Sequence, residues 1–362
     1  MTAGCGTDTV SRLIRLGKKL SAELSTSVYD VHGVLTRVTT NSGDIADALA
    51  HFLRAFAVDA TGASRDETPD IDIHLFAVET LEDSMSPAPE QAELLYNWGM
   101  LKIRHDGSCR YSRLDERAQV TADVEGCQAA GFTEMSLLES DWLVTNLFFY
   151  PLWAQLLKVK GLFPLHAAGL VREGRSILFL GRSGSGKSTL SISLVRSGFG
   201  LLSDDTVFLR EKDDRVEALS FPEEINVREE TIKLLPELSR VKNFTVNELR
   251  QKSSFSIEEL YPGSIVHSST PVVMAFPRIA DRESTTSEPM SSTDALSQSL
   301  RYGFFFLDPS TTERHFYIMS LLARQTRCFH FNTGSEQDGL VRAVNQLMAG
   351  PEQDGVPSEE GK

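Results

Sequence analysis

The sequence contains little cysteine, and its basic residues are fewer than its acidic ones. There is no Cys-x-x-Cys pair and no Cys/His cluster at metal-ligand spacing among its four cysteines, Cys5, Cys109, Cys127 and Cys328. We therefore expect reduced thiols in a reducing compartment. The 36 Lys and Arg residues against 50 Asp and Glu residues give a formal net charge of −14. This charge argues against nucleic acid and against an anionic membrane surface as partners.

Long hydrophobic segments are also missing. The longest apolar run, residues 142–157, contains Asn146, Pro151 and Gln155, and it is shorter than the roughly 20 residues of a membrane span. We expect a buried helical segment there, bent or broken at Pro151. The first 20 residues have no continuous apolar stretch of the kind found in signal peptides. These observations predict a cytoplasmic protein with no membrane partner.

The remaining composition is that of a globular protein. With 362 residues, 41% of them hydrophobic and 24% charged, the chain is long enough for two or three domains. Alternating apolar residues predict strands over residues 33–40, 71–78 and 99–106. Residues 42–56 have the spacing of an amphipathic helix, with Ser42 or Asp44 as its cap. We interpret residues 1–140 as an α+β accessory domain.

The pattern changes after residue 140, and we assign residues 141–349 to a second, α/β domain. Apolar runs predict strands at 163–171, 176–180 and 270–279 and a strand–acidic pair–strand segment at 199–210. Helical spacing occurs in 228–240 until Pro236 and again at 339–350. The segment 280–298 is rich in Ser, Thr, Asp and Glu, which predicts a mobile loop. We expect the acidic tail, residues 350–362, to be disordered.

One short segment of the second domain carries a specific pattern. The stretch "GRSGSGKST" matches the phosphate-binding pattern GxxxxGK[ST], also called Walker A, between a predicted strand and a helix that begins at Ser188. Glycines let successive N–H groups point inward as an anion-binding nest, and the helix N-terminus adds its dipole. The pattern predicts nucleotide binding by Gly181, Arg182, Ser183, Gly184, Ser185, Gly186, Lys187, Ser188 and Thr189.

Two acidic residues and one histidine lie close to this pattern in the sequence. Asp204 and Asp205 directly follow a predicted strand, where one carboxylate can hold Mg²⁺ and the other can accept a proton from a hydroxyl group. The alternative is an Asp-Asp turn between two strands. His166 lies on the strand before the glycine-rich segment, where a single histidine is more often a core residue than a functional one.

The order of these motifs resembles the catalytic domain of bacterial HPr kinase/phosphorylase. The chain has His166, then "GRSGSGKS", then "LVRSGFGLLSDD", as that family has a His-bearing strand, a phosphate loop, an Arg-x-Gly stretch and an Asp-Asp pair. It resembles the HPr-kinase-related branch still more, and phosphoenolpyruvate carboxykinase is a distant relative. The chain departs from the family at Thr189, where the family has Glu, and at "EEINVREE" (223–230), where it has Glu-Ile-Arg-Gly.

The resemblance implies a fold and a set of roles. The fold would be a P-loop kinase core of HPr-kinase/PEP-carboxykinase-like type. ATP would lie on Gly181–Thr189, with Mg²⁺ held by Ser188 and Asp205. Asp204 would be the catalytic base with His166 beside it, and Lys187 would contact the phosphates. Arg228, Lys233 and Arg278 are further candidates for phosphate or acceptor contacts, although surface charge is the commoner role of such residues.

The leading hypothesis is a kinase that uses Mg²⁺ and ATP to phosphorylate a hydroxyl group. Its acceptor would be a serine of a small protein or peptide, as the resemblance implies. The alternatives are a P-loop ATPase or nucleotide-dependent switch without a hydroxyl acceptor, and a regulator that only binds nucleotide. The sequence leaves open the acceptor, the choice of ATP over another nucleotide, a reverse phosphorylase reaction and assembly into a homo-oligomer.

Overall fold

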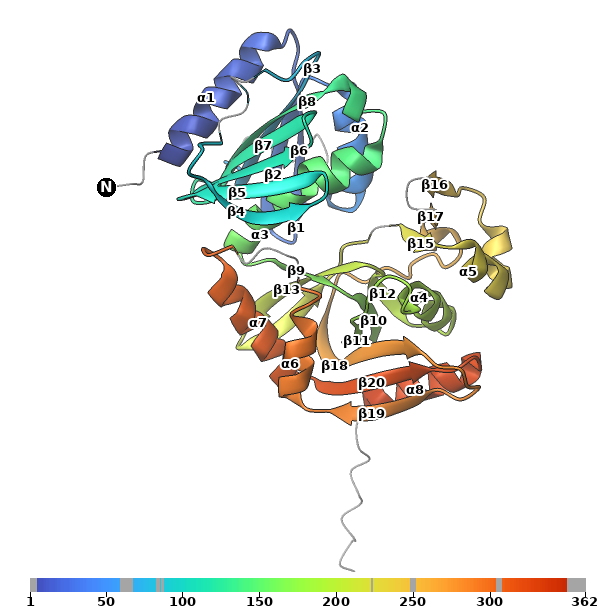
Figure 1. The fold of residues 1–362 in the computed structure, drawn as a ribbon. Coiled ribbons are helices and arrows are strands. Elements are labelled where there is room, and N and C mark those ends of the chain that lie inside the picture. The colour runs from blue at the N-terminus through green and yellow to red at the C-terminus, as the bar shows by residue number, and fades with distance from the viewer. Residues whose placement is uncertain are drawn as a thin grey trace, which may run out of the picture. The chain divides into compact units, whose positions relative to one another are not determined.

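The chain forms two compact units, each with its own β-sheet (Figure 1). The structure is a computed structural model that describes residues 5–58, 68–82, 85, 88–222, 224–247, 252–303 and 308–349. The first unit comprises Met1–Pro164 and Phe304–Tyr317, and the second comprises Leu165–Gly303 and Ile318–Lys362. Both units combine helices and sheets, so the chain is a mixed α/β protein, as the sequence predicts at this level.

The first unit is built on an eight-stranded sheet with the order β1-β2-β3-β8-β7-β6-β5-β4. Strand β3 runs parallel to both of its neighbours, β2 and β8, and all other neighbouring strands of the sheet are antiparallel. The strands are β1 (Ser25–Val31), β2 (Val34–Thr40), β3 (Ile71–Val78), β4 (Glu93–Trp98), β5 (Leu101–Asp106), β6 (Cys109–Leu114), β7 (Ala118–Asp123) and β8 (Gln128–Glu134).

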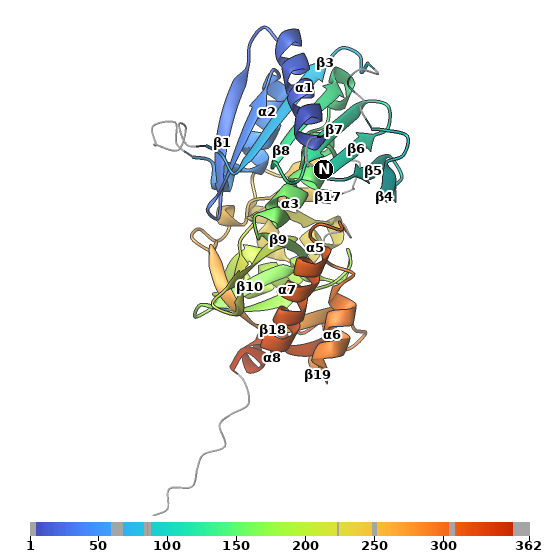
Figure 2. The same ribbon diagram turned by 90° about the vertical axis from the view of Figure 1, so that its left-hand side faces the viewer.

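Helices cover both faces of this sheet. On one face, α1 (Cys5–Leu20) packs its buried Val10 and Leu13 against Phe76 and Phe132. On the opposite face, Trp153 of α3 (Tyr150–Val159) donates a hydrogen bond to the Thr36 hydroxyl of β2, at 3.2 Å. The alternation of side chains along a strand explains this division, because odd and even positions of β3 face different helices. Figure 2 shows α1 lying along the sheet.

The helical predictions for this unit agree with the structure. Helix α2 spans Gly43–Phe52, and the Ser42 hydroxyl caps it by accepting a hydrogen bond from the backbone N–H of Ile45. The apolar run near residue 150 forms a π-helical turn, η5 (Leu143–Phe149), that continues as α3 with Pro151 in its first turn. Proline fits that position because the first N–H groups of a helix have no intrahelical partner. Short 3₁₀ turns occur at Arg54–Phe56 (η1) and Met135–Leu137 (η4).

The first unit includes a segment from late in the sequence, and a buried ion pair joins Asp308 of that segment to Arg110 of β6. Arg110 donates to both carboxylate oxygens of Asp308, at 2.5 and 2.8 Å, and these two residues are only 2% and 0% exposed. In the same unit Lys158 is buried and His315 is partly buried. Burial lowers the pKa of Lys158 to about 8, and burial together with the Lys158 charge lowers the pKa of His315 to about 3.

The second unit is built on a larger sheet. Its main path has the order β12-β10-β11-β18-β14-β13-β9, and β20 joins β18 to β19 at one side. Strands β11, β18 and β20 run parallel to one another. The strands are β9 (Phe163–His166), β10 (Ala168–Arg172), β11 (Arg175–Phe179), β12 (Gly200–Ser203), β13 (Thr206–Lys212), β14 (Arg215–Leu219), β18 (Ser268–Ile279), β19 (Thr286–Met290) and β20 (Arg327–Thr333).

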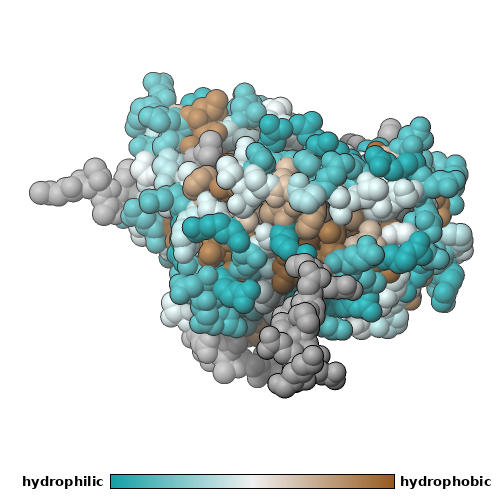
Figure 3. Space-filling model, turned by 90° about the horizontal axis from the view of Figure 1, so that it is seen from below, coloured by the Kyte–Doolittle hydropathy of each residue, from teal (hydrophilic) through white to brown (hydrophobic). Residues whose placement is uncertain are grey.

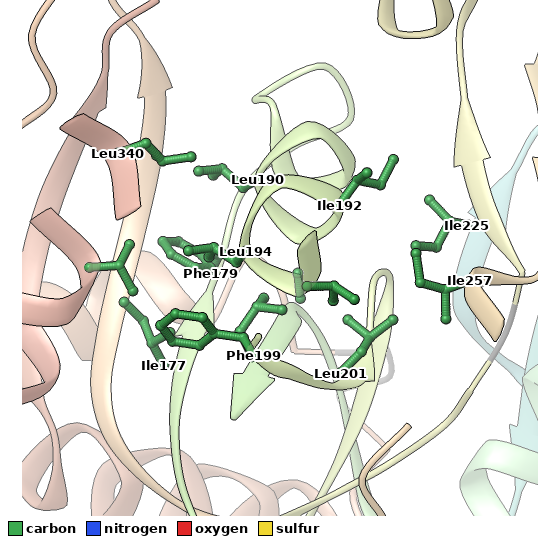
Figure 4. Close-up of a cluster of buried hydrophobic side chains, with 14 of the residues drawn as sticks. Ile177, Phe179, Leu190, Ile192, Leu194, Phe199, Leu201, Ile225, Ile257 and Leu340 are labelled. Carbon is green, nitrogen blue, oxygen red and sulfur yellow. The ribbon is translucent and has the colours of Figure 1, made fainter. Parts of the chain in front are cut away.

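A large apolar cluster lies between this sheet and its helices. Leu190 and Leu194 of α4 (Lys187–Arg196) pack with Phe179 of β11 and Leu340 of α8 (Gln337–Ala349), as Figure 4 shows. Ile225 and other buried residues of a small third sheet complete the cluster. That sheet has the order β15-β17-β16 and consists of β15 (Ile225–Val227), β16 (Thr245–Asn247) and β17 (Lys252–Phe255). This packing holds the first turn of α4 at the end of β11.

The remaining helical elements of the second unit are short. Helix α5 (Glu229–Leu234) ends before Pro236, which opens the 3₁₀ turn η6 (Pro236–Arg240), and η7 spans Ile257–Glu259. The end of α5 before Pro236 agrees with the sequence prediction. Helix α7 (Thr312–Gln325) begins in the first unit and ends in the second.

Two sequence predictions differ from the structure. The segment 280–298 is not a loop: it contains β19 and the helix α6 (Ser292–Ser299), capped by the Ser291 hydroxyl. Its polar composition suits an edge strand and a short exposed helix, so composition alone was misleading. The predicted strand 163–171 is two strands, because β9 pairs with β13 whereas β10 pairs with β11 and β12. The predicted tail, residues 350–362, lies outside the described residues.

The units also divide the chain at a different place from the expected boundary. The boundary at 140/141 follows a change of sequence pattern, whereas the structure places residues 141–164 in the first unit. The reason is that η5 and α3 bury their apolar side chains against the first sheet.

Hydrophilic side chains dominate the face shown in Figure 3, with smaller apolar areas between them. Within the described part of the chain, none of the helices combines the length and the apolar character needed to cross a membrane.

We predict that Asp308→Ala lowers the free energy of unfolding of the first unit by about 3–5 kcal/mol, because it leaves the Arg110 charge buried without its partner. Urea denaturation followed by circular dichroism measures this change. The control is Arg342→Ala, which removes an exposed ion pair with Glu336 and should cost less than about 1 kcal/mol. Equal losses in the two variants would contradict the prediction.

Candidate functional site

The glycine-rich segment forms a tight loop between β11 and α4. Gly184 and Gly186 have φ angles of 85° and 93°, in the left-handed region that side chains disfavour. The N–H of Ser185 donates to the carbonyl of Arg182 at 3.1 Å, which closes a turn inside the loop. A Cβ atom on Gly181 would lie 2.3 Å from the Ser185 hydroxyl oxygen. The backbone conformation therefore favours glycine at positions 184 and 186, and the close approach of the Ser185 side chain favours it at position 181.

The loop leads directly into the N-terminus of α4. Gly186 is the N-cap residue, and no side chain caps the helix by a hydrogen bond. The first N–H groups of a helix have no intrahelical acceptor, and the helix dipole places a partial positive charge of roughly 0.5 at this end. The segment thus offers backbone donors and positive potential to an anion, as the sequence predicts for Ser188 and Thr189.

Lys187 is a buried cation in the centre of this loop. It is 7% exposed, its ammonium group donates to the Gly181 carbonyl at 2.5 Å, and it lies 3.1 Å from His166 Nε2. Burial lowers the pKa of Lys187, and the carboxylates of Asp205 and Asp204 partly offset that effect. Because the charged ammonium group can only donate, Nε2 of His166 is the acceptor in this contact.

That contact determines the proton position on the imidazole ring. With Nε2 accepting from Lys187, the ring proton is on Nδ1, which lies 3.4 Å from Asp205 Oδ1. Burial lowers the pKa of His166, Asp205 opposes this shift, and Lys187 reinforces it. His166 thus lies between the lysine and the Asp205 carboxylate, and its burial disfavours the charged form of the ring. The structure thus brings this residue into the site.

The two aspartates lie in the turn between β12 and β13. The Ser203 hydroxyl accepts hydrogen bonds from the backbone N–H groups of Thr206 and Asp205, at 3.1 and 3.3 Å, and so shapes the turn. The Asp-Asp turn expected as an alternative is therefore present, and the Asp204 side chain also contacts Ser188 of the glycine-rich segment.

The environments of the two carboxylates differ strongly. Asp204 is 6% exposed and accepts a hydrogen bond from the Ser188 hydroxyl at 2.7 Å, whereas its other oxygen, Oδ1, has no partner among the described residues. Burial raises the pKa of Asp204, and the neighbouring hydroxyls of Ser191 and Ser188 counteract part of this. Asp205 has a side chain that is 43% exposed and contacts His166.

These contacts exchange the two pairings expected from the resemblance. The expectation placed Ser188 with Asp205 and His166 with Asp204, whereas the structure pairs Ser188 with Asp204 and His166 with Asp205. Adjacent residues in this turn point in different directions, so Asp204 turns inward to α4 and Asp205 turns toward β9. Sequence order does not show which of two neighbouring aspartates turns inward.

The end of β18 forms a wall of the loop that the sequence analysis did not identify. Pro277 and Ile279 lie 3.3 and 3.6 Å from the positions that Cβ atoms on Gly181 and Gly186 would occupy. Parallel pairing of β11 with β18 brings these strand ends together, which a pairing prediction could have found. The charge of Lys252 on β17 also acts on His166 and lowers its pKa.

The other charged candidates do not gather at this loop by any contact that the structure shows. Lys233 forms an exposed pair with Glu229 within α5, Arg228 precedes that helix, and Arg278 is exposed on β18. Lys233 and Arg228 are therefore explained as ordinary surface charges. Arg278 lies between the two wall residues of β18.

The site has the donor set that a nucleotide with a divalent cation requires. Backbone N–H groups and Lys187 suit phosphate, and the Ser188 and Asp204 oxygens are hard ligands of the kind Mg²⁺ prefers. The unpartnered Oδ1 of Asp204 fits this use. The described residues contain no group of three or more His, Cys, Asp or Glu side chains placed to hold a metal. A cation here would therefore share its coordination with phosphate oxygens.

Comparisons with known proteins identify no family for this chain. No protein-family model matches the chain, and no curated protein matches it. One solved structure, described as the Hpr(Ser) kinase/phosphatase from Coxiella burnetii, is similar to it with 13% sequence identity and a TM-score of 0.27, over 52% of this chain and 99% of that one.

We predict that Asp204→Asn raises the free energy of unfolding at pH 7. The raised pKa means that the folded state disfavours the charged carboxylate, so wild-type stability falls as pH rises above the unfolded pKa of about 3.9. The difference in the free energy of unfolding between the variant and wild type should therefore shrink as pH is lowered toward 4. Thermal unfolding at pH 7, 6 and 5 measures it. Asp205→Asn is the control, and an equal gain there, or a gain independent of pH, would contradict the prediction.

Proposed function

We propose that the chain is a kinase that uses Mg²⁺ and ATP to transfer the γ-phosphoryl group to a hydroxyl, on a serine of a small protein or peptide. The observation that carries the proposal is the separation of two adjacent carboxylates by their partners. Asp204 is buried against the Ser188 hydroxyl, and Asp205 is half-exposed against His166. A kinase needs one carboxylate on its metal and another free to meet the acceptor.

The glycine-rich loop and Lys187 would bind the nucleotide phosphates. The uncapped first turn of α4 supplies N–H donors, and Lys187 supplies the buried cation beside them. Ser188 and Asp204 would hold the divalent cation, which supplies charge neutralisation at the transferred phosphoryl group. This assignment replaces Asp205 by Asp204 as the metal ligand.

Asp205 would then be the catalytic base, in place of Asp204. The oxygen of the acceptor hydroxyl forms a bond to the γ-phosphorus, the bond from that phosphorus to the β–γ bridging oxygen breaks, and ADP leaves. The hydroxyl proton goes to the Asp205 carboxylate. His166 lies between the two groups, with Nε2 accepting from Lys187 and Nδ1 3.4 Å from Asp205 Oδ1, and it would hold this carboxylate in place. His166 is thus a positioning residue in this proposal.

The proposal is tested with purified protein, γ-labelled ATP and a lysate of the native host. We expect a labelled protein or peptide with wild-type enzyme and none with Lys187→Ala. Asp205→Asn should lower the transfer rate by about 10²–10⁴-fold while ATP binding persists. Asp204→Asn should instead weaken the Mg²⁺-dependent part of ATP binding. Asp214→Asn is the matched control, since Asp214 is exposed in the β13–β14 turn.

The outcomes separate the alternatives. Rapid release of phosphate without any labelled acceptor would overturn the kinase in favour of an ATPase. Normal transfer by Asp205→Asn would overturn the base assignment alone. Failure of the wild-type protein to bind ATP would overturn the whole proposal.

A further inference from the structure

A cavity lies in the first unit, on the sheet face formed by β5, β6 and β7. Its volume is about 630 Å³, and its lining includes the cations Lys102, Arg104 and Arg113 together with Gln119 and Thr121. A cavity of this size is within the range of about 300–1,000 Å³ that small-molecule sites occupy. The nucleotide proposal does not use any of these residues.

The strand register places these side chains on one face. Lys102 of β5 is opposite Arg113 of β6, and Arg113 is in turn opposite Gln119 of β7. Directly opposite residues point to the same side of a sheet. Helix α1 packs over β7 and β8 on this side, where Thr7 donates to Asp123 at 2.7 Å. The positions on β5 and β6 lie beyond that contact and line the cavity instead.

Positive charge is concentrated here in a chain that is acidic overall. Like charges directly opposite each other in a sheet are destabilising, and Lys102 and Arg113 have that relation. Arg113 is bonded to Glu116, and Arg104 donates to the carbonyl of Ala92 at 3.0 Å. The exposed side chain of Lys102 has neither an ion pair nor a hydrogen bond with any described residue. Glu90 and Glu116 also line the cavity, so three cations face two carboxylates.

A buried donor without a partner points to the same conclusion. Gln119 is 6% exposed, and its Nε2 atom has no hydrogen-bond partner among the described residues. A buried polar group that makes no hydrogen bond destabilises the fold, so such groups are uncommon without a ligand or another purpose. The cavity therefore combines three cationic side chains with the buried Gln119 amide in its lining. Both suit a ligand that carries negative charge and, once the Gln119 side chain turns toward it, accepts a hydrogen bond.

We propose that this cavity binds a small organic anion with carboxylate or phosphate groups. Lys102 and Arg104 would pair with the anionic group, and Gln119 would donate to an oxygen of the same molecule. The cavity volume favours a small molecule over a protein chain as occupant. This inference is independent of the proposed kinase activity, since its residues lie in the other unit.

The test uses the full-length chain carrying Lys187→Ala, so that the glycine-rich loop does not compete for anions. Isothermal titration calorimetry with citrate and with inorganic phosphate, at constant ionic strength, distinguishes carboxylate from phosphate recognition. We expect saturable binding of at least one probe, weakened about tenfold by Lys102→Gln. Lys19→Gln, the same change on the exposed end of α1, should leave the affinity unchanged. Absence of saturable binding of both probes, or equal affinity in Lys102→Gln, would overturn the proposal.

Gln119→Met provides a second, independent readout. Methionine has nearly the same volume but no N–H group, so we expect an unchanged or higher melting temperature together with an affinity at least about fivefold lower. A loss of thermal stability without a loss of affinity would show that Gln119 serves the fold and would overturn its role in binding.

Discussion

The contacts of the Lys187 ammonium group organise the second unit's candidate site. Its charge is buried, and its neighbours are the Gly181 carbonyl and the Nε2 atom of His166. The first of these contacts holds the glycine-rich loop around the lysine. The second determines which nitrogen of His166 carries the proton, and thereby directs an N–H group at Asp205. Loop shape, imidazole tautomer and carboxylate orientation therefore follow from one buried cation.

The buried polar groups of the site lower the stability of the folded protein, and this loss of stability indicates a functional role. Asp204 is buried with one oxygen unpaired, and its pKa is raised because the surroundings disfavour its charge. Evolution retains such groups where function needs them, and active sites are where perturbed pKa values concentrate. The same reasoning applies in the first unit to Gln119, whose buried amide also has an unused donor. The two units thus each contain polar groups whose partners would be ligands.

Much of the local structure could be predicted from the sequence. The helix after Ser42, the end of α5 before Pro236, and the strand–loop–helix order around Lys187 all follow from caps, proline and apolar spacing. The polar edge strand β19 could not be predicted, because pairing with β20 rather than its own composition makes it a strand. Helix α1 gave no recognised signal either, although it supplies part of the first core.

By itself, the sequence determined which residues could form an anion-binding loop, because glycine and lysine at fixed spacing act through the backbone nearby. It also placed His166, Asp204 and Asp205 as candidates around that loop. Only the tertiary structure decided the pairing of Ser188 with Asp204 and of His166 with Asp205. It likewise brought Lys102, Arg113 and Gln119 onto one sheet face. The reason is that strand register and the direction of a turn's side chains depend on contacts between segments far apart in the chain.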